Sequence, residues 1–327
     1  GIRDVAVAGV QTCALPISGD ESLARRPMDR IIKPLMEMGA RVEGTRIEGR
    51  NATFPPLTIR GGALHGIDYT LPVASAQVKS CVLFAGLFAK GNTVVREAIQ
   101  TRDHTEIALR EFGAEIDVHQ KVVTLAEGAK LTGRELTVPG DLSSAAFFLV
   151  AASLLPESNL VIHNVGLNPT RTALLDFLTS VGASIKIIDV KQSGGELIGS
   201  LRVRAAKISG GVIEGALTAA LIDEIPALSV LGAASSGGLV VRDAAELRVK
   251  ETDRIATIEA NLKRMGVEIE STPDGFRIPG GQKFHAAALH SEGDHRIAMA
   301  FAVAALASDG PCTIEEAESA GVSFPEF

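Results

Sequence analysis

Tryptophan is absent from the 327-residue sequence, tyrosine occurs once and cysteine three times. Cys13, Cys81 and Cys312 lie far apart without a CxxC spacing, which argues against a disulfide framework and favours free thiols in a reducing compartment. Positive charge is also in deficit, because 32 Lys and Arg face 39 Asp and Glu. A surface that follows nucleic-acid phosphates needs clustered positive charge, so we expect no nucleic-acid partner.

Long apolar runs and the common catalytic motifs are missing as well. The longest apolar runs, such as residues 145–156, fall short of the roughly 20 residues that cross a bilayer, so we expect a cytoplasmic protein without a membrane partner. The sequence has no GxxxxGK[ST] loop, GxSxG elbow or HExxH motif, and its seven histidines show no ligand spacing. We therefore expect neither a cofactor nor a metal.

The length and the 46% hydrophobic content are sufficient for about two domains of roughly 150 residues each. Residues 1–18 have a single Arg next to Asp4 instead of a basic start, no Ala-x-Ala cleavage site closes them as in a signal peptide, and they match nothing further along the chain. We expect them to be a non-native leader.

Two helical patterns each occur four times along the sequence. The first is an alanine-rich helix followed by a β-branched strand, in residues 75–97, 143–164, 223–243 and 294–315. The second is an amphipathic helix that ends at a glycine and leads into a short alternating strand, with the glycines at Gly39, Gly113, Gly182 and Gly266. Such repeats predict an α/β fold of βαβαββ modules packed around shared helices, although two unrelated α/β domains would also fit.

The heptad RVKETDR, residues 248–254, stands before the helix that ends at Gly266. If it forms the first helical turns, Lys250, Glu251 and Arg254 share one face and could hold a small polyanion beside an acid/base group. The alternative is a solvated helix start capped near Thr252 or Asp253.

Polar residues also recur where the other repeated helices are expected to begin. Unpaired backbone N–H groups and the helix dipole favour anions at such ends, although single residues there could be simple caps. These residues are Arg25 and Arg26; Ser75, Gln77 and Lys79; Ser143 and Ser144; Asp223 and Glu224; and Asp294, His295 and Arg296.

Taken with these repeats, eight segments resemble the enolpyruvyl transferases, and within them the 5-enolpyruvylshikimate-3-phosphate synthases. The segments, in family order, are SGDESLARRPM, PVASAQVKS, TRDHTE, PGDLSSAAFF, IDEIPAL, LRVKETDR, GDHRIAMA and VSFPEF. The related UDP-N-acetylglucosamine enolpyruvyl transferases share the fold but lack this combination.

The resemblance implies an α/β protein with a two-domain inside-out α/β barrel of repeated βαβαββ modules and with substrates in the cleft between the lobes. We place an incomplete first lobe at residues 19–186 and the second lobe at residues 187–327. The family's N-terminal substrate-binding segments have no counterpart here, so we expect this polypeptide to be inactive or poorly active, whereas the parent gene encodes an active enzyme.

The implied reaction moves the enolpyruvyl group of phosphoenolpyruvate to the 5-hydroxyl of shikimate 3-phosphate, a step in aromatic amino-acid biosynthesis, in an expected monomer. Asp223 and Glu251 are the implied acid/base pair, with their individual roles open. The implied phosphoenolpyruvate contacts are Arg26, Gln77, Arg254 and Arg296. The implied shikimate 3-phosphate contacts are Ser75, Ala76, Gln77, Ser144, Phe147, Asp223, Glu246 and Lys250.

Some positions depart from the family pattern: Ala76 replaces Ser, Phe147 replaces Tyr, Glu246 replaces Asn, and Val322 stands where some members carry a substrate-binding Lys. Two other functions stay open, namely UDP-N-acetylglucosamine 1-carboxyvinyltransferase and a fragment that binds phosphometabolites without converting them.

Overall fold

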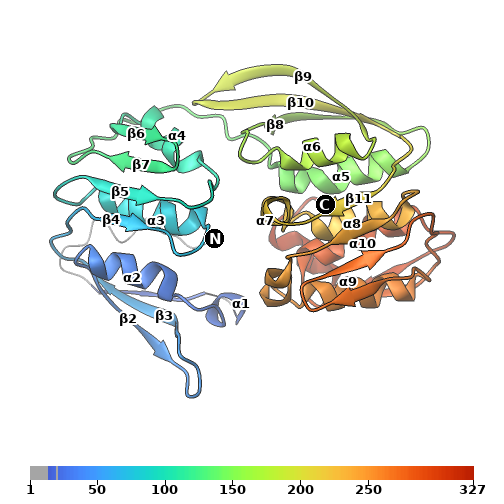
Figure 1. Cartoon of the computed structure of the whole chain (residues 1–327), viewed down its shortest axis with the longest axis horizontal. Helices are drawn as coiled ribbons and strands as arrows, with labels where there is room; N and C mark the ends of the chain where they lie inside the picture. The colour runs from blue at the N-terminus through green and yellow to red at the C-terminus, as the bar shows by residue number, and fades with distance from the viewer. Residues whose placement is uncertain (1–13, 20) are drawn as a thin grey trace. The chain divides into compact units, whose positions relative to one another are not determined.

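The computed structural model describes residues 14–19 and 21–327. The helices are α1 (Glu21–Ala24), α2 (Asp29–Glu37), α3 (Ala76–Gly86), α4 (His104–Glu111), α5 (Leu142–Leu154), α6 (Ala173–Ser180), α7 (Ala216–Leu221), α8 (Ile225–Ala234), α9 (Arg254–Arg264) and α10 (His295–Leu306) (Figure 1). There are also two 3₁₀ helices: η2 (Ala245–Val249) precedes α9, and η3 (Ala317–Val322) comes after α10.

Sixteen strands join these helices in the described part of the chain. They are β1 (Ala14–Ile17), β2 (Arg41–Arg46), β3 (Thr53–Arg60), β4 (Asp68–Thr70), β5 (Thr93–Arg96), β6 (Ile116–His119), β7 (Val122–Leu125), β8 (Asn159–Gly166), β9 (Ser184–Ser193), β10 (Glu196–Arg204), β11 (Gly211–Ile213), β12 (Leu239–Val241), β13 (Glu270–Thr272), β14 (Gly275–Ile278), β15 (Ala288–His290) and β16 (Thr313–Glu315).

The sheets confirm the repeated module. One sheet has the order β4-β5-β7-β6 and another has the equivalent order β11-β12-β14-β13. In both, the first pair is parallel and the other two are antiparallel, as the chain order βαβαββ produces. A third copy has the order β8-β10-β9, with Gly140 bridged in parallel to Val165 of β8.

The four glycines end the amphipathic helices as predicted. Gly39, Gly113, Gly182 and Gly266 have φ values of 101°, 97°, 98° and 79°, and they follow α2, α4, α6 and α9. This left-handed conformation costs a residue with a Cβ about 1–2 kcal/mol, which explains why glycine occupies all four ends.

The chain divides into two compact units, Gly1–Thr137 and Val138–Phe327, called here the first and the second unit. The boundary expected between residues 186 and 187 differs, because that point lies inside β9, which pairs with β10 along most of its length. The α5 helix, expected in the first lobe, instead packs against α8 and α10. Shared burial of these apolar helices therefore places the boundary before α5.

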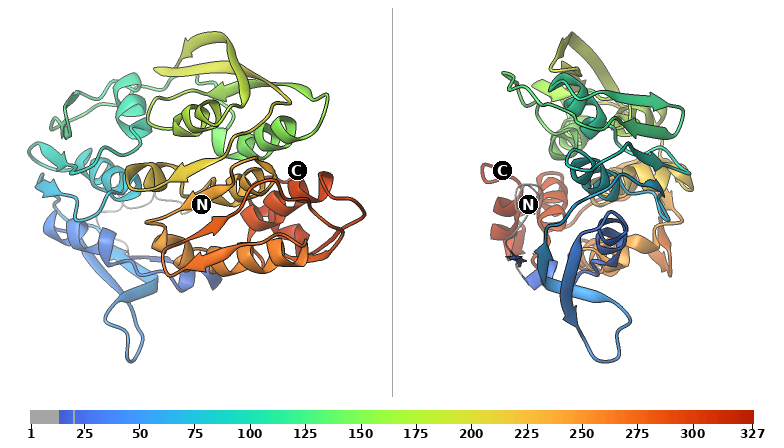
Figure 2. Two further views of the ribbon diagram at one scale, coloured as in Figure 1. Left: turned by 45° about the vertical axis from the view of Figure 1, so that its right-hand side comes forward. Right: turned by 90° about the vertical axis from the view of Figure 1, so that its left-hand side faces the viewer.

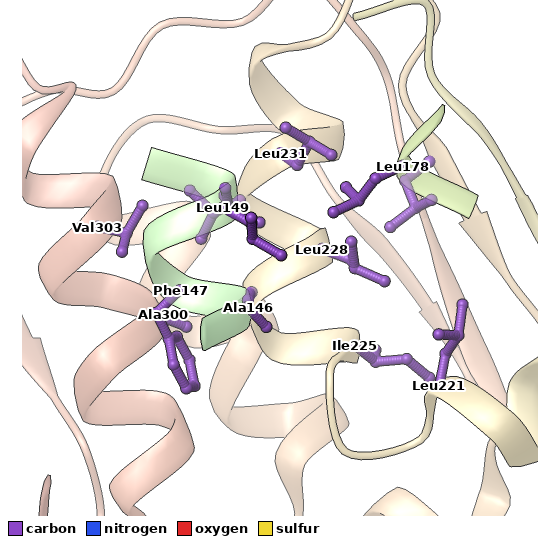
Figure 3. Packing of buried hydrophobic residues seen from close by; sticks show 14 of the residues in the cluster. Ala146, Phe147, Leu149, Leu178, Leu221, Ile225, Leu228, Leu231, Ala300 and Val303 are labelled. Carbon is purple, nitrogen blue, oxygen red and sulfur yellow. The ribbon is translucent and has the colours of Figure 1, made fainter. Parts of the chain in front are cut away.

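The core of the second unit is built on those three helices. Ala146 and Ala300 are fully buried, and their small side chains allow α5 and α10 to approach closely beside Leu149, Leu228 and Leu231 (Figure 3). The α5 helix also packs, together with α6, on one face of the three-stranded sheet β8-β10-β9 (Figure 2). The buried helices bring their N-terminal turns to neighbouring positions, which is where the charged residues occur.

The expected leader coincides in part with ordered structure. Ala14–Ile17 forms β1 and pairs antiparallel with β3, with Ala14 opposite Arg60 and Ile17 opposite Leu57. Residues 1–13 lie outside the described residues, so for them the leader stays a prediction. In the described part of the chain, no helix is long and apolar enough to span a membrane.

Candidate functional site

Arg254 is the centre of the candidate site in the second unit. It is the first residue of α9, and its side chain is 1% exposed. Its Nε donates to Asp294 Oδ2 at 2.7 Å, and its Nη2 donates to Glu251 Oε2 at 2.6 Å and to Asp294 Oδ1 at 3.3 Å. Within the described structure Nη1 is buried without a hydrogen-bond partner, although Asp223 Oδ1 lies 3.7 Å away. A guanidinium held this way has donor capacity left for an anionic oxygen.

Asp223 connects Arg254 to a second cation. Lys250 Nζ lies 3.9 Å from Asp223 Oδ1 and donates to Glu246 Oε1 at 3.1 Å. The side chains of Lys250 and Asp223 are about one-fifth exposed, so they border solvent while Arg254 does not. The site thus combines a buried cation, a partly exposed cation and four carboxylates, those of Asp223, Glu246, Glu251 and Asp294.

Arg296 provides a third cation in the first turn of α10. Its Nη1 donates to the backbone carbonyl of Asp223 at 2.9 Å and to Ser143 Oγ at 3.2 Å. Asp294 caps the same helix and accepts from the Arg296 backbone N–H at 2.8 Å. Asp294 therefore fixes both the helix start beside Arg296 and the guanidinium of Arg254.

The neighbouring His295 is not a further cation. Burial lowers the pKa of His295, and the charge of Asp294, which acts in the opposite direction, does not offset it. The imidazole is therefore neutral at pH 7, and the positive charge of the site comes from arginine and lysine.

The heptad RVKETDR does not form the first turns of α9, so that expectation is wrong. Ala245–Val249 is the 3₁₀ helix η2, and α9 begins only at Arg254, because Asp253 caps it by accepting from Ala256 N at 3.0 Å. The capping alternative is thus confirmed for Asp253. The irregular link still brings Lys250 and Glu251 to Asp223 and Arg254.

For the other two residues expected in the second unit, the structure shows contacts outside the cluster around Arg254. Ser144 donates its Oγ to Asp141 Oδ2 at 3.2 Å, and Asp141, rather than either serine, caps α5. Phe147 is 1% exposed inside the core, with its ring edge-on to that of Phe327 at 6.0 Å.

The remaining expected site residues belong to the first unit, at two helix starts. Ser75 caps α3 by accepting from Val78 N at 3.4 Å, and Ala76 and Gln77 occupy the first turn. The carbonyl of Ala76 accepts from Ser80 Oγ at 2.8 Å. Arg26 is half-buried in the link between α1 and α2, and its backbone N–H donates to Leu23 O at 3.1 Å.

Below that turn of α3 lies a buried charge cluster, Lys79, Glu97 and Glu106. Lys79 Nζ is 3.0 Å from Glu97 Oε2 and 2.6 Å from Glu106 Oε1, and all three side chains are at most 3% exposed. Burial raises the pKa of Glu106, against the opposing hydrogen bond and charge of Lys79. The cluster ties α3 to α4 and to Glu97, the residue that follows β5.

Sequence reasoning did not select three polar residues that touch the site or its neighbours. The sequence marks Ser143 and Glu224 only as positions at helix starts, and it gives no signal for Arg171. Its Nη2 lies 3.4 Å from Glu224 Oε1, across 53 positions of sequence. No spacing signal joins residues so far apart.

In the part of the chain that the structure describes, no group of three or more His, Cys, Asp and Glu residues could hold a metal ion. The repeated βαβαββ modules and the cations at neighbouring helix starts agree with the resemblance to the enolpyruvyl transferases. The chain belongs to the EPSP synthase (3-phosphoshikimate 1-carboxyvinyltransferase) family, whose model matches residues 5–327. That match begins within the segment expected to be a leader.

Individual relatives agree with this assignment. The 3-phosphoshikimate 1-carboxyvinyltransferase of Solibacter usitatus is 60% identical over 321 residues, which are 98% of this chain and 74% of the relative. The enzyme of that name from Koribacter versatilis is 54% identical, over 95% of this chain and 71% of its own length. The EPSP synthase structure from Acinetobacter baumannii aligns with a TM-score of 0.85 at 41% identity, over 97% of this chain and 73% of that one.

Proposed function

We propose that this chain carries the phosphoenolpyruvate-binding and proton-transfer groups of a 3-phosphoshikimate 1-carboxyvinyltransferase. The proposed reaction joins the enolpyruvyl group of phosphoenolpyruvate to the 5-hydroxyl of shikimate 3-phosphate and releases inorganic phosphate. The family assignment supports it, and so do relatives of the same name at 60% and 54% identity.

The observation that carries the proposal is the buried Arg254. Its Nη1 is desolvated within the described structure without a hydrogen-bond partner, while Lys250 lies near the Asp223 carboxylate and Arg296 donates to the Asp223 backbone carbonyl. Guanidinium groups match the planar carboxylate and the phosphate of phosphoenolpyruvate, and charge-assisted bonds of this kind are about twice as strong as neutral ones. Arg254 and Arg296 are the proposed ligands here, together with Arg26 and Gln77 of the first unit.

Asp223 is the proposed acceptor of the proton of the attacking hydroxyl. Its Oδ1 lies 3.9 Å from Lys250 Nζ and 3.7 Å from Arg254 Nη1, at the place where the cations of the site meet. Glu251 is then the proposed acid that protonates the methylene carbon. The hydroxyl oxygen bonds to the central carbon of phosphoenolpyruvate, and the resulting adduct carries a methyl group.

The second half of the reaction reverses the proton transfer at carbon. The methyl group loses a proton to the carboxylate of Glu251, the carbon–oxygen bond to phosphate breaks, and the enol ether forms. Phosphate leaves with its electron pair and takes up the proton held by Asp223, so the protons balance. Arg254, Arg296 and Lys250 would stabilise the charge that develops on the leaving phosphate.

The acceptor would be held by groups from both units as sequence-based proposals: Lys250, Glu246 and Ser144, with Ser75, Ala76 and Gln77. Because Phe147 is buried, we assign it packing beneath the site rather than direct contact. Action in the cytoplasm as a monomer, without cofactor or metal, also stays a prediction.

A phosphate-release assay with both substrates tests the proposal. It is run on this chain and on a version in which the N-terminal region of the Solibacter usitatus relative replaces residues 1–18. Release that needs both substrates, and that Asp223→Asn abolishes, supports the proposal. A folded extended chain that binds the substrates without release favours the binding fragment, and release with UDP-N-acetylglucosamine in place of shikimate 3-phosphate favours the related transferase.

A further inference from the structure

A chain of buried polar contacts leads away from Arg296 into the second unit. Arg296 Nη1 donates to Ser143 Oγ at 3.2 Å, and the Ser143 hydroxyl donates to Glu224 Oε1. Glu224 Oε1 in turn lies 3.4 Å from Arg171 Nη2, which is 3.7 Å from Asp141 Oδ1. These contacts join α10, α5, α8 and the segment before α6.

The direction of the hydrogen bonds follows from counting donors. A serine hydroxyl has one proton to donate and two lone pairs to accept with, and a guanidinium only donates. Because Ser143 accepts from Arg296, its own proton is available for Glu224. An acceptor at Glu224 therefore keeps the Ser143 lone pair directed at Arg296.

Burial restricts these side chains to their present hydrogen bonds. Ser143 is 1% exposed, and the side chain of Glu224 is 4% exposed, so neither group has water as an easy substitute partner. Arg171 lies within ion-pair distance of the Glu224 carboxylate and is itself only 13% exposed. A buried carboxylate is tolerated when a charge partner and hydrogen bonds compensate it, and both are present here.

We propose that Glu224, held by Arg171, is a positioning residue that orients Arg296 through the Ser143 hydroxyl. This inference rests on the proposed function, in which Arg296 binds phosphoenolpyruvate. With Nη1 fixed between Ser143 and the Asp223 carbonyl, the plane of the guanidinium is set and the Nε and Nη2 edge has a defined direction. Binding of a planar anion depends on that direction more than on the charge alone.

Asp223 shares in the effect. Its backbone carbonyl accepts from the same Nη1, and Glu224 is the next residue, so the Glu224 contacts also fix the backbone that carries the Asp223 carboxylate. One buried carboxylate thus sets the relative placement of a substrate-binding cation and the proposed base.

The alternative is that Glu224 and Arg171 only hold α8 to the segment before α6. Substitution would then lower stability without a selective effect on phosphoenolpyruvate. Ser143→Ala and Glu224→Gln test the relay, and Ser153→Ala is the matched control. Ser153 is also fully buried on α5, but its hydroxyl donates only to the Leu149 carbonyl of its own helix.

The first measurement needs no ligand. A double-mutant cycle of Glu224→Gln and Arg296→Lys is measured by urea unfolding of the full chain. We expect non-additivity of at least about threefold in the unfolding equilibrium constant, since residues in one network are coupled. Additive effects would overturn the proposal even if the chain binds neither substrate, so this outcome is separate from failure of the proposed function.

The second measurement is the affinity for phosphoenolpyruvate with saturating shikimate 3-phosphate, by calorimetry on the same chain. Ser143→Ala and Glu224→Gln should each raise the Kd for phosphoenolpyruvate about tenfold, as expected for a weakened charge-assisted hydrogen bond. The Kd for shikimate 3-phosphate, which Arg296 does not bind in this proposal, should rise by a clearly smaller factor, and Ser153→Ala should change neither Kd. An equal rise in both Kd values, or no rise in either, would mean that Glu224 has only a structural role.

Discussion

Asp294 holds the guanidinium of Arg254 from one side, through Nε at 2.7 Å and Nη2 at 3.3 Å, and both side chains are at most 1% exposed. The carboxylate also caps α10, so the first residue of α9 and the first turn of α10 are fixed together. The pair explains how a desolvated arginine with donor capacity to spare can be kept inside an acidic protein.

Asp294→Asn should therefore be strongly destabilising. The amide can still cap α10, but it leaves the buried Arg254 without its main counter-charge, and breaking a buried pair costs about 3–5 kcal/mol. The free energy of unfolding in urea measures the effect. Glu214→Gln is the control: Glu214 Oε2 and Arg242 Nη1 are 2.6 Å apart, but the side chains are 55% and 62% exposed, and such pairs contribute about 0–1 kcal/mol. Similar losses for the two variants would contradict the role of Asp294.

Gly182→Ala should destabilise the second unit by about 1–2 kcal/mol. Gly182 has a φ of +98°, and a Cβ there would lie 3.0 Å from the Lys207 carbonyl, so both the backbone and the space disfavour it. Thermal unfolding followed by circular dichroism provides the measurement. Gly133→Ala, where an added Cβ meets nothing within 4 Å, should leave stability unchanged or slightly higher. If Gly182→Ala is as stable as Gly133→Ala, the left-handed helix end does not explain why position 182 is glycine.

Phe327→Ala should loosen the C-terminal segment from α5. The Phe327 ring lies 5.7 Å from that of Phe148 and 5.8 Å from that of Phe324, and it is 42% exposed, so we expect a loss of about 1–2 kcal/mol rather than the cost of a core cavity. The free energy of unfolding of the second unit in urea measures this loss. Val322→Ala, at 81% exposure in the same segment, should have no effect. An equal loss there would mean that the aromatic contacts do not hold the segment.

The repeated elements could be predicted because their signals are local. Each amphipathic helix ends at a glycine that must adopt positive φ, and each strand follows within a few residues, so spacing alone located α2, α4, α6 and α9. The charged cluster could be found for the same reason, since Lys250, Glu251 and Arg254 are near neighbours in sequence, although only Arg254 belongs to α9.

What sequence reasoning missed depends on contacts between distant segments. The unit boundary depends on which helices share a core, and α5 gave no local sign that it packs with α8 and α10. The contact of Ser143 with Glu224 spans 81 positions, and that of Arg171 with Glu224 lies between separate elements. Such pairings are set by the packed modules, so the residues behind Arg296 could not be identified from spacing.

Glu106 should make the first unit less stable as the pH rises. Burial raises its pKa, so the folded state holds the proton more tightly than the unfolded state, whose reference value is 4.5. Below pH 4.5 Glu106 is protonated in both the folded and the unfolded state, so the free energy of unfolding is not lowered. As the pH climbs from about 4.5 through the raised folded-state pKa, ionisation costs stability, because Lys79 is shared with Glu97 and Glu106 Oε2 has no hydrogen-bond partner among the described residues.

Glu106→Gln removes this titration, so the variant should gain stability relative to the unchanged chain across that window and level off above it. The absence of tryptophan makes the measurement specific, because the single tyrosine, Tyr69, is 9% exposed in the core of the first unit and its fluorescence reports unfolding there. Glu115→Gln, at an exposed position after α4, is the control and should show no such trend. A difference between Glu106→Gln and the unchanged chain that stays constant with pH would mean that Lys79 compensates the buried carboxylate fully, so that its ionisation costs the fold nothing.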